Sequence, residues 1–281
     1  MLGGGVVGVE MAQAWATLGS KVTLVEAEPG LLGREEPFVS EQVADGLRAV
    51  GVDVRCGAKA AAVRRDGAVV TMEVEDGNPI AADEILVAVG RRPHTDDLGL
   101  ETVGLEPGKS IEVDDQLRAR GSEWLYAVGD ANGRALLTHS GKYQARIAGD
   151  HIRGRDVAAT ADGPMSPRVV FTDPQVAAVG HTLKSAEEAG LGVRAVDHAT
   201  GAVAGASFYG RGADGTARLV IDEDRRLVVG ATFTGPDVGE LLHAATIAVV
   251  GEVTLDRLWH AIPSFPTRSE VWLRLLQKYG V

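Results

Sequence analysis

The chain has 281 residues, of which 45% are hydrophobic and 24% charged, a composition typical of globular proteins that excludes a disordered or collagen-like chain. Its 39 acidic and 28 basic residues give a net charge of −11, which argues against nucleic acid or an anionic membrane as a partner. The single cysteine, Cys56, excludes an intrachain disulfide and a cysteine-based zinc site.

A glycine-rich turn begins at Gly3, almost at the start of the chain. The hydrophobic periodicity then predicts a helix over Met11–Leu18 and a strand over Lys21–Glu26. The elements expected next are a helix over Gln42–Val50 and strands over Val52–Arg55, Ala60–Arg64, Ala68–Glu75 and Ile85–Val89, with turn signals at Asp66-Gly67 and Asp76-Gly77.

Residues 92–163 are rich in loops, with a strand predicted over Trp124–Val128 and a helix over Ser140–Ile152. A linker at 162–167 separates them from an α+β pattern. In that last part we expect strands over Val169–Phe171, Ala217–Asp222 and Leu227–Thr234, and helices over Lys184–Ala189, Val238–Val250, Thr254–His260 and Ser269–Lys278, with Thr254 and Ser269 as N-caps.

The chain shows no signal-peptide pattern at its start, and its longest apolar stretch, around Leu241–Val250, is too short to cross a bilayer. We therefore expect a cytoplasmic protein.

The opening turn, Gly3-Gly4-Gly5-Val6-Val7-Gly8, fits the pattern G-x-G-x-x-G of dinucleotide-binding turns. The first glycine permits the tight turn, the second lets the backbone approach a pyrophosphate, and the third allows close packing of helix on strand. Such a fold needs a strand before the turn, which Met1 and Leu2 are too short to supply. We therefore expect the chain to be the downstream part of a longer polypeptide.

Glu26 ends the strand after the turn, 23 residues beyond Gly3, where an acidic residue accepts hydrogen bonds from the adenosine ribose. Its carboxylate would repel a 2′-phosphate, so NADH is favoured over NADPH. Arg34 is the nearby alternative that would hold such a phosphate.

Several segments, in this order, resemble those of the pyridine nucleotide–disulfide oxidoreductases, a family of flavoproteins. They are GGGVVGVE (Gly3–Glu10), AVGRRPHT (Ala88–Thr95), LYAVGDANG (Leu125–Gly133), LLTH (Leu136–His139), FTDPQVAAVGHT (Phe171–Thr182) and IPSFPTRSE (Ile262–Glu270).

The resemblance implies an α/β chain with three parts. Residues 1–91 form a Rossmann-like NAD domain with a truncated first strand, residues 92–163 form the returning part of an FAD domain, and residues 165–281 form an α+β dimerisation domain that makes a homodimer.

The resemblance also implies the cofactors, FAD and NAD, and the residues that bind them. NAD is expected at Gly3, Gly4, Gly5, Val6, Val7, Gly8, Val9, Glu10 and Glu26, with Gly90 on the nicotinamide side. FAD is expected at Asp130 and at Leu136, Leu137, Thr138 and His139, which precede a helix whose N-terminus faces the flavin.

Three of these residues have plainer alternatives: a turn aspartate for Asp130, a helix-capping residue for His139 and a first-turn glutamate for Glu10. In the family, Glu10 matches a glutamate that pairs with a lysine, which here would lie outside the chain, so Glu10 is expected to be unpaired. Arg91-Arg92-Pro93 has two readings, a part of the site or a structural crossing between domains.

The C-terminal signature departs from the family pattern at one position. The resemblance implies a catalytic role for Glu270, which in disulfide-reducing members orients a histidine, but Phe265 stands where that histidine is expected. Phenylalanine carries no proton, and a positioned base contributes about 10²–10⁴-fold to rate. A shift of His260 into its place is the alternative.

We therefore expect an FAD-dependent NAD(P)H oxidoreductase that passes hydride from NADH to FAD and electrons on to a quinone, a metal ion, O₂ or another small oxidant. One alternative is a disulfide reductase of the dihydrolipoamide dehydrogenase type. The other is a non-catalytic nucleotide-binding and dimerisation fragment.

Overall fold

The computed structural model of the chain describes residues 1–75, 77–210 and 213–281, so Asp76 of the predicted Asp76-Gly77 turn lies outside the described residues. The helices are α1 Val6–Thr17, α2 Pro37–Ala49, α3 Thr138–Ile152, α4 Leu183–Glu188, α5 Gly239–Val250, α6 Leu255–Trp259 and α7 Glu270–Tyr279. The strands are β1 Thr23–Val25, β2 Asp53–Arg55, β3 Ala60–Asp66, β4 Val69–Val74, β5 Ile80–Ala82, β6 Arg168–Val170, β7 Gln175–Gly180, β8 Val193–Ala199, β9 Thr216–Asp222 and β10 Leu227–Gly235.

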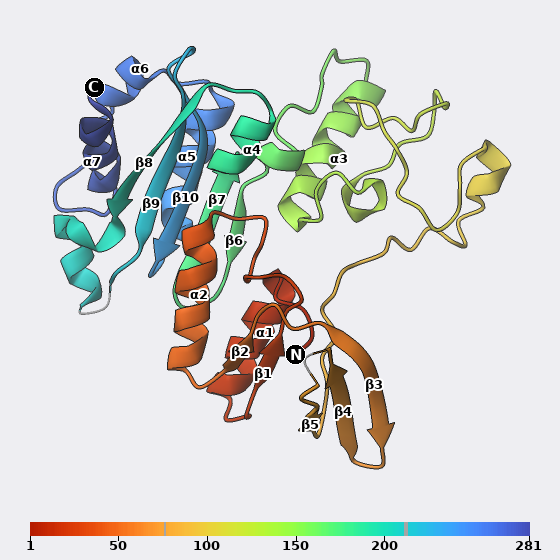
Figure 1. Cartoon of the computed structure of the whole chain (residues 1–281). Coiled ribbons are helices and arrows are strands. Elements are labelled where there is room, and N and C mark those ends of the chain that lie inside the picture. Colours follow the sequence, from red (N-terminus) through yellow and green to blue (C-terminus); the bar gives the residue numbers. More distant parts are fainter. Residues whose placement is uncertain (76, 211–212) are drawn as a thin grey trace.

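Figure 1 shows these elements in three groups. The first holds α1, α2, β1 and β2 together with the β3–β5 sheet. The second holds α3 and the surrounding loops, and the third is a five-stranded sheet with α4–α7. This arrangement confirms the expected α/β fold followed by an α+β part.

The first group is built on a small parallel sheet. Strands β1 and β2 pair in parallel, and Leu2 forms parallel bridges with both Val25 and Val87. The predicted strand Ile85–Val89 is wrong. Its neighbour in the sheet is the single residue Leu2, so Val87 forms an isolated bridge and no extended strand develops. Leu2 thus occupies the place of the strand that precedes the glycine turn.

The second group contains few regular elements before α3. The predicted strand Trp124–Val128 is also wrong, since its pairing is limited to one bridge between Arg118 and Tyr126. A short 3-10 turn, Gly129–Asn132, follows directly. It lies against α3, which begins at Thr138.

The third group is an antiparallel sheet of order β6-β7-β10-β9-β8. Helix α5 packs on β7 and β10, and α7 packs on β8 and β9. Between them lies a core in which Phe233, Leu219 and Ile221 are fully buried. Each such side chain contributes about 1.5–3 kcal/mol by leaving water.

Polar contacts at the start of α2 join the first group to the third. Glu36 is buried, and its carboxylate accepts from Leu183 N at 2.8 Å and from Arg218 Nη1 at 2.9 Å. The adjacent Glu35 accepts two hydrogen bonds from Arg168, at 2.6 and 2.9 Å. Buried charges are tolerated only when paired in this way, so these contacts fix how the two groups meet.

Candidate functional site

The glycine turn is closed so tightly that two of its glycines have no room for a side chain. A Cβ on Gly8 would lie 1.8 Å from the Gly3 carbonyl oxygen, and one on Gly3 would lie 2.6 Å from the Ala88 oxygen. Gly3 also has φ +103°, a backbone conformation that favours glycine. The first turn of helix α1 therefore packs directly against the backbone of Gly3.

Gly5 lies at the open side of the same turn. It is the N-cap of α1, it is exposed, and no heavy atom lies within 4 Å of where its Cβ would be. Val6 and Val7, in the first turn of α1, are nearly half exposed, while Val9 is buried in the core. The unpaired N–H groups of a helix start and its positive potential favour an anion at this face.

Glu26 connects the end of β1 to the glycine turn. One carboxylate oxygen accepts from Gly4 N at 2.5 Å, and the other accepts from Glu28 N at 2.8 Å. The side chain thus lies beside the turn, as the sequence predicts for an acidic residue on the ribose of a bound nucleotide.

A short segment, 86–91, links this turn to the second predicted site. Leu2 exchanges backbone hydrogen bonds with it, donating to Leu86 O at 2.9 Å and accepting from Ala88 N at 2.7 Å. Three residues beyond Ala88, Arg91 Nη1 donates to Asp130 Oδ2 at 3.0 Å and to Leu136 O at 3.3 Å. Gly90 between them is exposed, with φ +147° and open space around it.

Asp130 is on the 3-10 turn before α3. Its side chain is 54% exposed and that of Arg91 is 55% exposed, so the pair faces solvent. Leu137 is the N-cap of α3, Thr138 and His139 form its exposed first turn, and His139 Nε2 lies 2.6 Å from Pro167 O. The structure brings the five residues predicted to bind FAD together around one helix start.

Arg91 contacts two of the residues predicted to bind FAD, and our sequence interpretation left its role open. It directly follows Gly90 in the segment that resembles the family, so its place in that segment was the available signal.

Two expectations need correction. Glu10 is not unpaired, because its Oε1 accepts from the backbone N–H of Phe171 at 2.8 Å and thereby ties α1 to the third group. Ser269 precedes α7 in a helical conformation, with φ −61° and ψ −16°, and its side chain makes no capping hydrogen bond. Thr254 does cap α6, accepting from Arg257 N at 3.4 Å.

Glu270 lies in the first turn of α7 and is buried. Its Oε2 has no hydrogen-bond partner within the part of the chain that the structure describes. Phe265 is 77% exposed, and His260 is also exposed.

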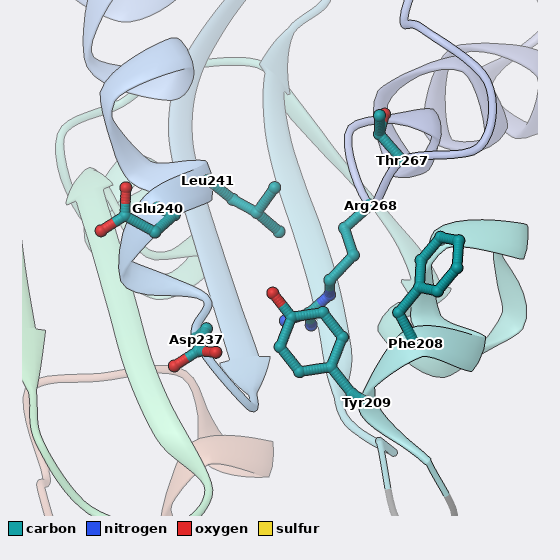
Figure 2. Close-up of a pocket in the computed structure, with 8 residues that line it drawn as sticks. Phe208, Tyr209, Asp237, Glu240, Leu241, Thr267 and Arg268 are labelled. Carbon is teal, nitrogen blue, oxygen red and sulfur yellow. The ribbon is translucent and has the colours of Figure 1, made fainter.

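A cavity of about 320 Å³ lies beside this C-terminal segment (Figure 2). Arg268 extends into its wall under the ring of Tyr209, with the guanidinium carbon 4.9 Å from the ring centroid. Asp237 and Glu240 line the side formed by the start of α5. The cavity is separate from both predicted dinucleotide sites, whose residues do not line it.

Burial raises the pKa of the half-buried Cys56 thiol, while the nearby Arg48 charge lowers it and the Glu26 charge raises it by smaller amounts. In the described ranges, no group of three or more His, Cys, Asp and Glu side chains is arranged to hold a metal ion. Among the same residues, none of the helices combines the length and apolar character needed to span a membrane.

Two sequence patterns of known families match the chain. That of the pyridine nucleotide-disulphide oxidoreductases matches residues 1–147, and that of the dimerisation domain of the same proteins matches residues 166–275.

Individual proteins are also similar over nearly the whole chain. A dihydrolipoyl dehydrogenase of Haloferax volcanii is 36% identical over 277 residues, which are 96% of this chain and 58% of the relative. The crystal structure of LpdA from Mycobacterium tuberculosis matches with a TM-score of 0.88 and 26% identity, over 100% of this chain and 61% of that one. The HOCl-induced flavoprotein disulfide reductase RclA from Escherichia coli matches with a TM-score of 0.85 and 27% identity, over 98% and 63%. The chain thus spans about 58% of the length of the curated relative.

Proposed function

Since the chain belongs to the pyridine nucleotide-disulphide oxidoreductase family, we propose that it serves FAD-dependent oxidation of NADH, with the electrons delivered to a small acceptor. One observation carries the proposal: segment 86–91 touches both predicted dinucleotide sites. Its Ala88 bonds to Leu2 beside the glycine turn, and its Arg91 bonds to Asp130. Three residues of backbone span at most about 11 Å, so the two sites are neighbours.

On the NADH side, the residues fit a dinucleotide. The first turn of α1 presents backbone N–H groups beside the open Gly5, and a pyrophosphate is the group that such a helix start holds. Glu26, already fixed by Gly4 and Glu28, would accept from the ribose hydroxyls and disfavour a 2′-phosphate. NADH is therefore the proposed donor, in preference to NADPH.

On the FAD side, the residues fit as well. Asp130 offers an exposed carboxylate, and the start of α3, from Leu136 to His139, offers backbone N–H groups with a positive potential. FAD, when bound, supplies the electron transfer itself. The protein's share is to hold negative charge at the helix start and to orient the ligand through Asp130.

The proposed electron acceptor follows from Phe265, which stands at the position where disulfide-reducing members have a histidine. With Phe265 in place of a proton-carrying side chain, we favour an acceptor that needs no acid or base for a thiol, such as a quinone, a metal ion or O₂. The competing candidate is disulfide reduction, which the similarity to a dihydrolipoyl dehydrogenase favours. The dimerisation pattern over 166–275 supports a homodimer.

The test is the visible spectrum of purified protein, expressed once as this chain and once together with the reading frame upstream of Met1, followed by NADH oxidation assays. We expect no stoichiometric flavin in this chain alone, and in the longer product we expect bound flavin, NADH oxidation with a quinone and little activity with lipoamide. Faster turnover of lipoamide than of any quinone would favour the disulfide reductase. A colourless longer product that does not oxidise NADH would overturn the proposal and leave a nucleotide-binding and dimerisation role.

A further inference from the structure

Helix α3 buries a polar side chain directly under the turn that carries Asp130. Gln144 is fully buried, and its amide makes three hydrogen bonds. Its Oε1 accepts from Gly129 N at 2.7 Å and from Asn132 Nδ2 at 2.9 Å, so it holds both ends of the 3-10 turn Gly129–Asn132. Burying an amide costs free energy unless it is paired, and two of the three hydrogen bonds that pair Gln144 go to this one turn.

Close backbone packing against α3 also restricts the position of the 3-10 turn Gly129–Asn132. Gly129 has φ +69°, and the backbone packs so closely that a Cβ on Gly141 would lie 3.2 Å from Gly129 Cα. Gly141 and Gln144 are three residues apart on α3 and therefore share a face. The helix thus offers a space at Gly141 and a hydrogen-bond acceptor at Gln144, and the turn fits between them.

The donor side of the amide is also engaged. Gln144 Nε2 donates to Asp162 Oδ2 at 3.0 Å, and Arg134 Nη2 donates to Asp162 Oδ1 at 3.1 Å. Asn132 accepts from Arg134 N at 2.9 Å and donates to Ala127 O at 3.0 Å. Because the carboxylate of Asp162 accepts only, it fixes which end of the Gln144 side chain faces the turn.

We propose that Gln144 is the positioning residue of the flavin site: it sets the Asp130 carboxylate relative to the start of α3. Both parts of the proposed site are close to this one amide, since Asp130 directly follows Gly129, which donates to Gln144, and residues 136–139 lead into and begin the helix that carries Gln144. This inference rests on the proposed FAD site. It adds that the geometry depends on a residue six positions beyond that helix start, which contacts no ligand.

Two substitutions separate the contacts. Gln144→Met keeps length and volume but removes all three hydrogen bonds. Gln144→Glu keeps the oxygen acceptors but places a second carboxylate against Asp162, and protonation of that pair at lower pH restores a donor. Tyr143→Phe is the matched control, because it removes one hydrogen bond on α3, from Thr160 N to Tyr143 Oη at 3.0 Å, away from the turn.

The first measurement needs no flavin: amide hydrogen exchange at Gly129 in the purified chain. We expect Gln144→Met to speed this exchange about tenfold or more, since the half-buried N–H of Gly129 loses its partner, and Tyr143→Phe to leave it unchanged. The second measurement is FAD affinity, by quenching of flavin fluorescence, in the protein expressed together with the upstream reading frame. Gln144→Met should weaken it at least about fivefold, and Gln144→Glu should regain affinity between pH 8 and pH 5.5, a recovery that a merely destabilised fold would not give.

Unchanged exchange at Gly129 in Gln144→Met overturns the inference, whether or not flavin binds. Wild-type affinity for FAD in that variant overturns it too. Absence of FAD binding by the wild-type protein counts against the proposed function instead, and the exchange comparison still tests the role of Gln144. If Gln144→Met does not fold, the pH-dependent exchange of Gln144→Glu decides the same question.

Discussion

Gly8 has no room for a side chain, whereas Gly5, three residues earlier, has open space where its Cβ would point. Gly8→Ala would place a methyl group against the Gly3 carbonyl oxygen, and neither backbone segment can yield without opening the turn. We expect the free energy of unfolding, measured by urea unfolding, to fall by at least about 2 kcal/mol. We also expect NADH binding, measured by fluorescence titration, to be lost.

Gly5→Ala is the matched variant for that experiment. Its φ of −75° suits any residue, so the unfolding midpoint should stay that of the wild type. Its methyl group would occupy the space proposed for the pyrophosphate, so NADH affinity should fall about tenfold. Equal stability and equal NADH affinity in Gly5→Ala would show that the open side of the turn holds no phosphate.

Glu26→Ala tests the ribose contact. Hydrogen bonds to a charged acceptor contribute about 1.5–3 kcal/mol each, so we expect at least a tenfold loss in NADH affinity. The ratio of NADH affinity to NADPH affinity should also fall, because the Glu26 carboxylate no longer repels the 2′-phosphate of NADPH. The same substitution frees Gly4 N, so Glu26→Gln, which keeps an acceptor oxygen, serves as the control for damage to the turn. An unchanged affinity for NADH in Glu26→Ala would remove Glu26 from the site.

At the scale of elements, each α-helix in the described residues was predicted, whereas several strands were not. Helix α3 begins two residues before its predicted start, and α1 and α2 begin five residues before theirs. Strands β5, β7 and β8 were missed. Strand β5 has three residues, β7 is rich in alanine and follows Asp173-Pro174, and β8 alternates with charged residues, so none of them shows the β-branched run that marked the other strands.

The candidate site was predictable as far as its residues lie in short motifs. The glycine turn, Glu26 and the Asp130 turn are contiguous patterns with a physical reason for each residue type. Two hydrogen bonds are instead tertiary contacts. Glu10 accepts from Phe171 N, 161 residues away, and Gln144 accepts from Gly129 N, 15 residues away. Sequence periodicity carries no information on such contacts, since a lone Glu or Gln on a helix is ordinary.

The junction of α2 with the C-terminal sheet gives a prediction for stability. Hydrogen bonds to Asp197, and the charge of Glu36, raise the pKa of the Arg218 guanidinium further above its already high value. Arg218→Met would leave the buried Glu36 without its cation, which costs about 3–5 kcal/mol in buried pairs. We expect a loss of this order in urea unfolding, partly recovered by adding Glu36→Gln.

Arg48→Gln is the comparison for that experiment, because the Arg48–Asp45 pair is exposed on both sides and should contribute less than about 1 kcal/mol. Similar losses in Arg218→Met and Arg48→Gln would mean that the α2 junction does not hold the two groups together.

For the whole molecule, the first and third groups share buried hydrophobic side chains and also meet through polar contacts. Glu10 and Glu35 reach from the first group to the third, and Arg91 reaches to the second. One buried cluster crosses from the first group to the third, because Val170 and Val176 pack with the side chains of α1 and α2, whereas the clusters of the second group stay within it. The two proposed cofactor sites lie on the first and second groups, so their relative placement depends on segment 86–91 and the exposed Arg91–Asp130 pair, and it should respond to salt more than the cores do.

Mild acid should destabilise the molecule through two histidines whose pKa is lowered by folding. Burial lowers the pKa of His181, helped by Arg168, and burial lowers that of His198, helped by Lys278 and Arg274. Folding thus depresses both values below the unfolded value of about 6.5, so below that pH the unfolded chain binds more protons. Stability is fully present above pH 6.5 and declines as the pH falls through it. We expect the thermal midpoint to drop by a few degrees between pH 7.5 and pH 5.5, and the double variant His181→Asn/His198→Gln to flatten that slope. A slope that persists in the double variant would assign the acid sensitivity to the carboxylate contacts between the groups.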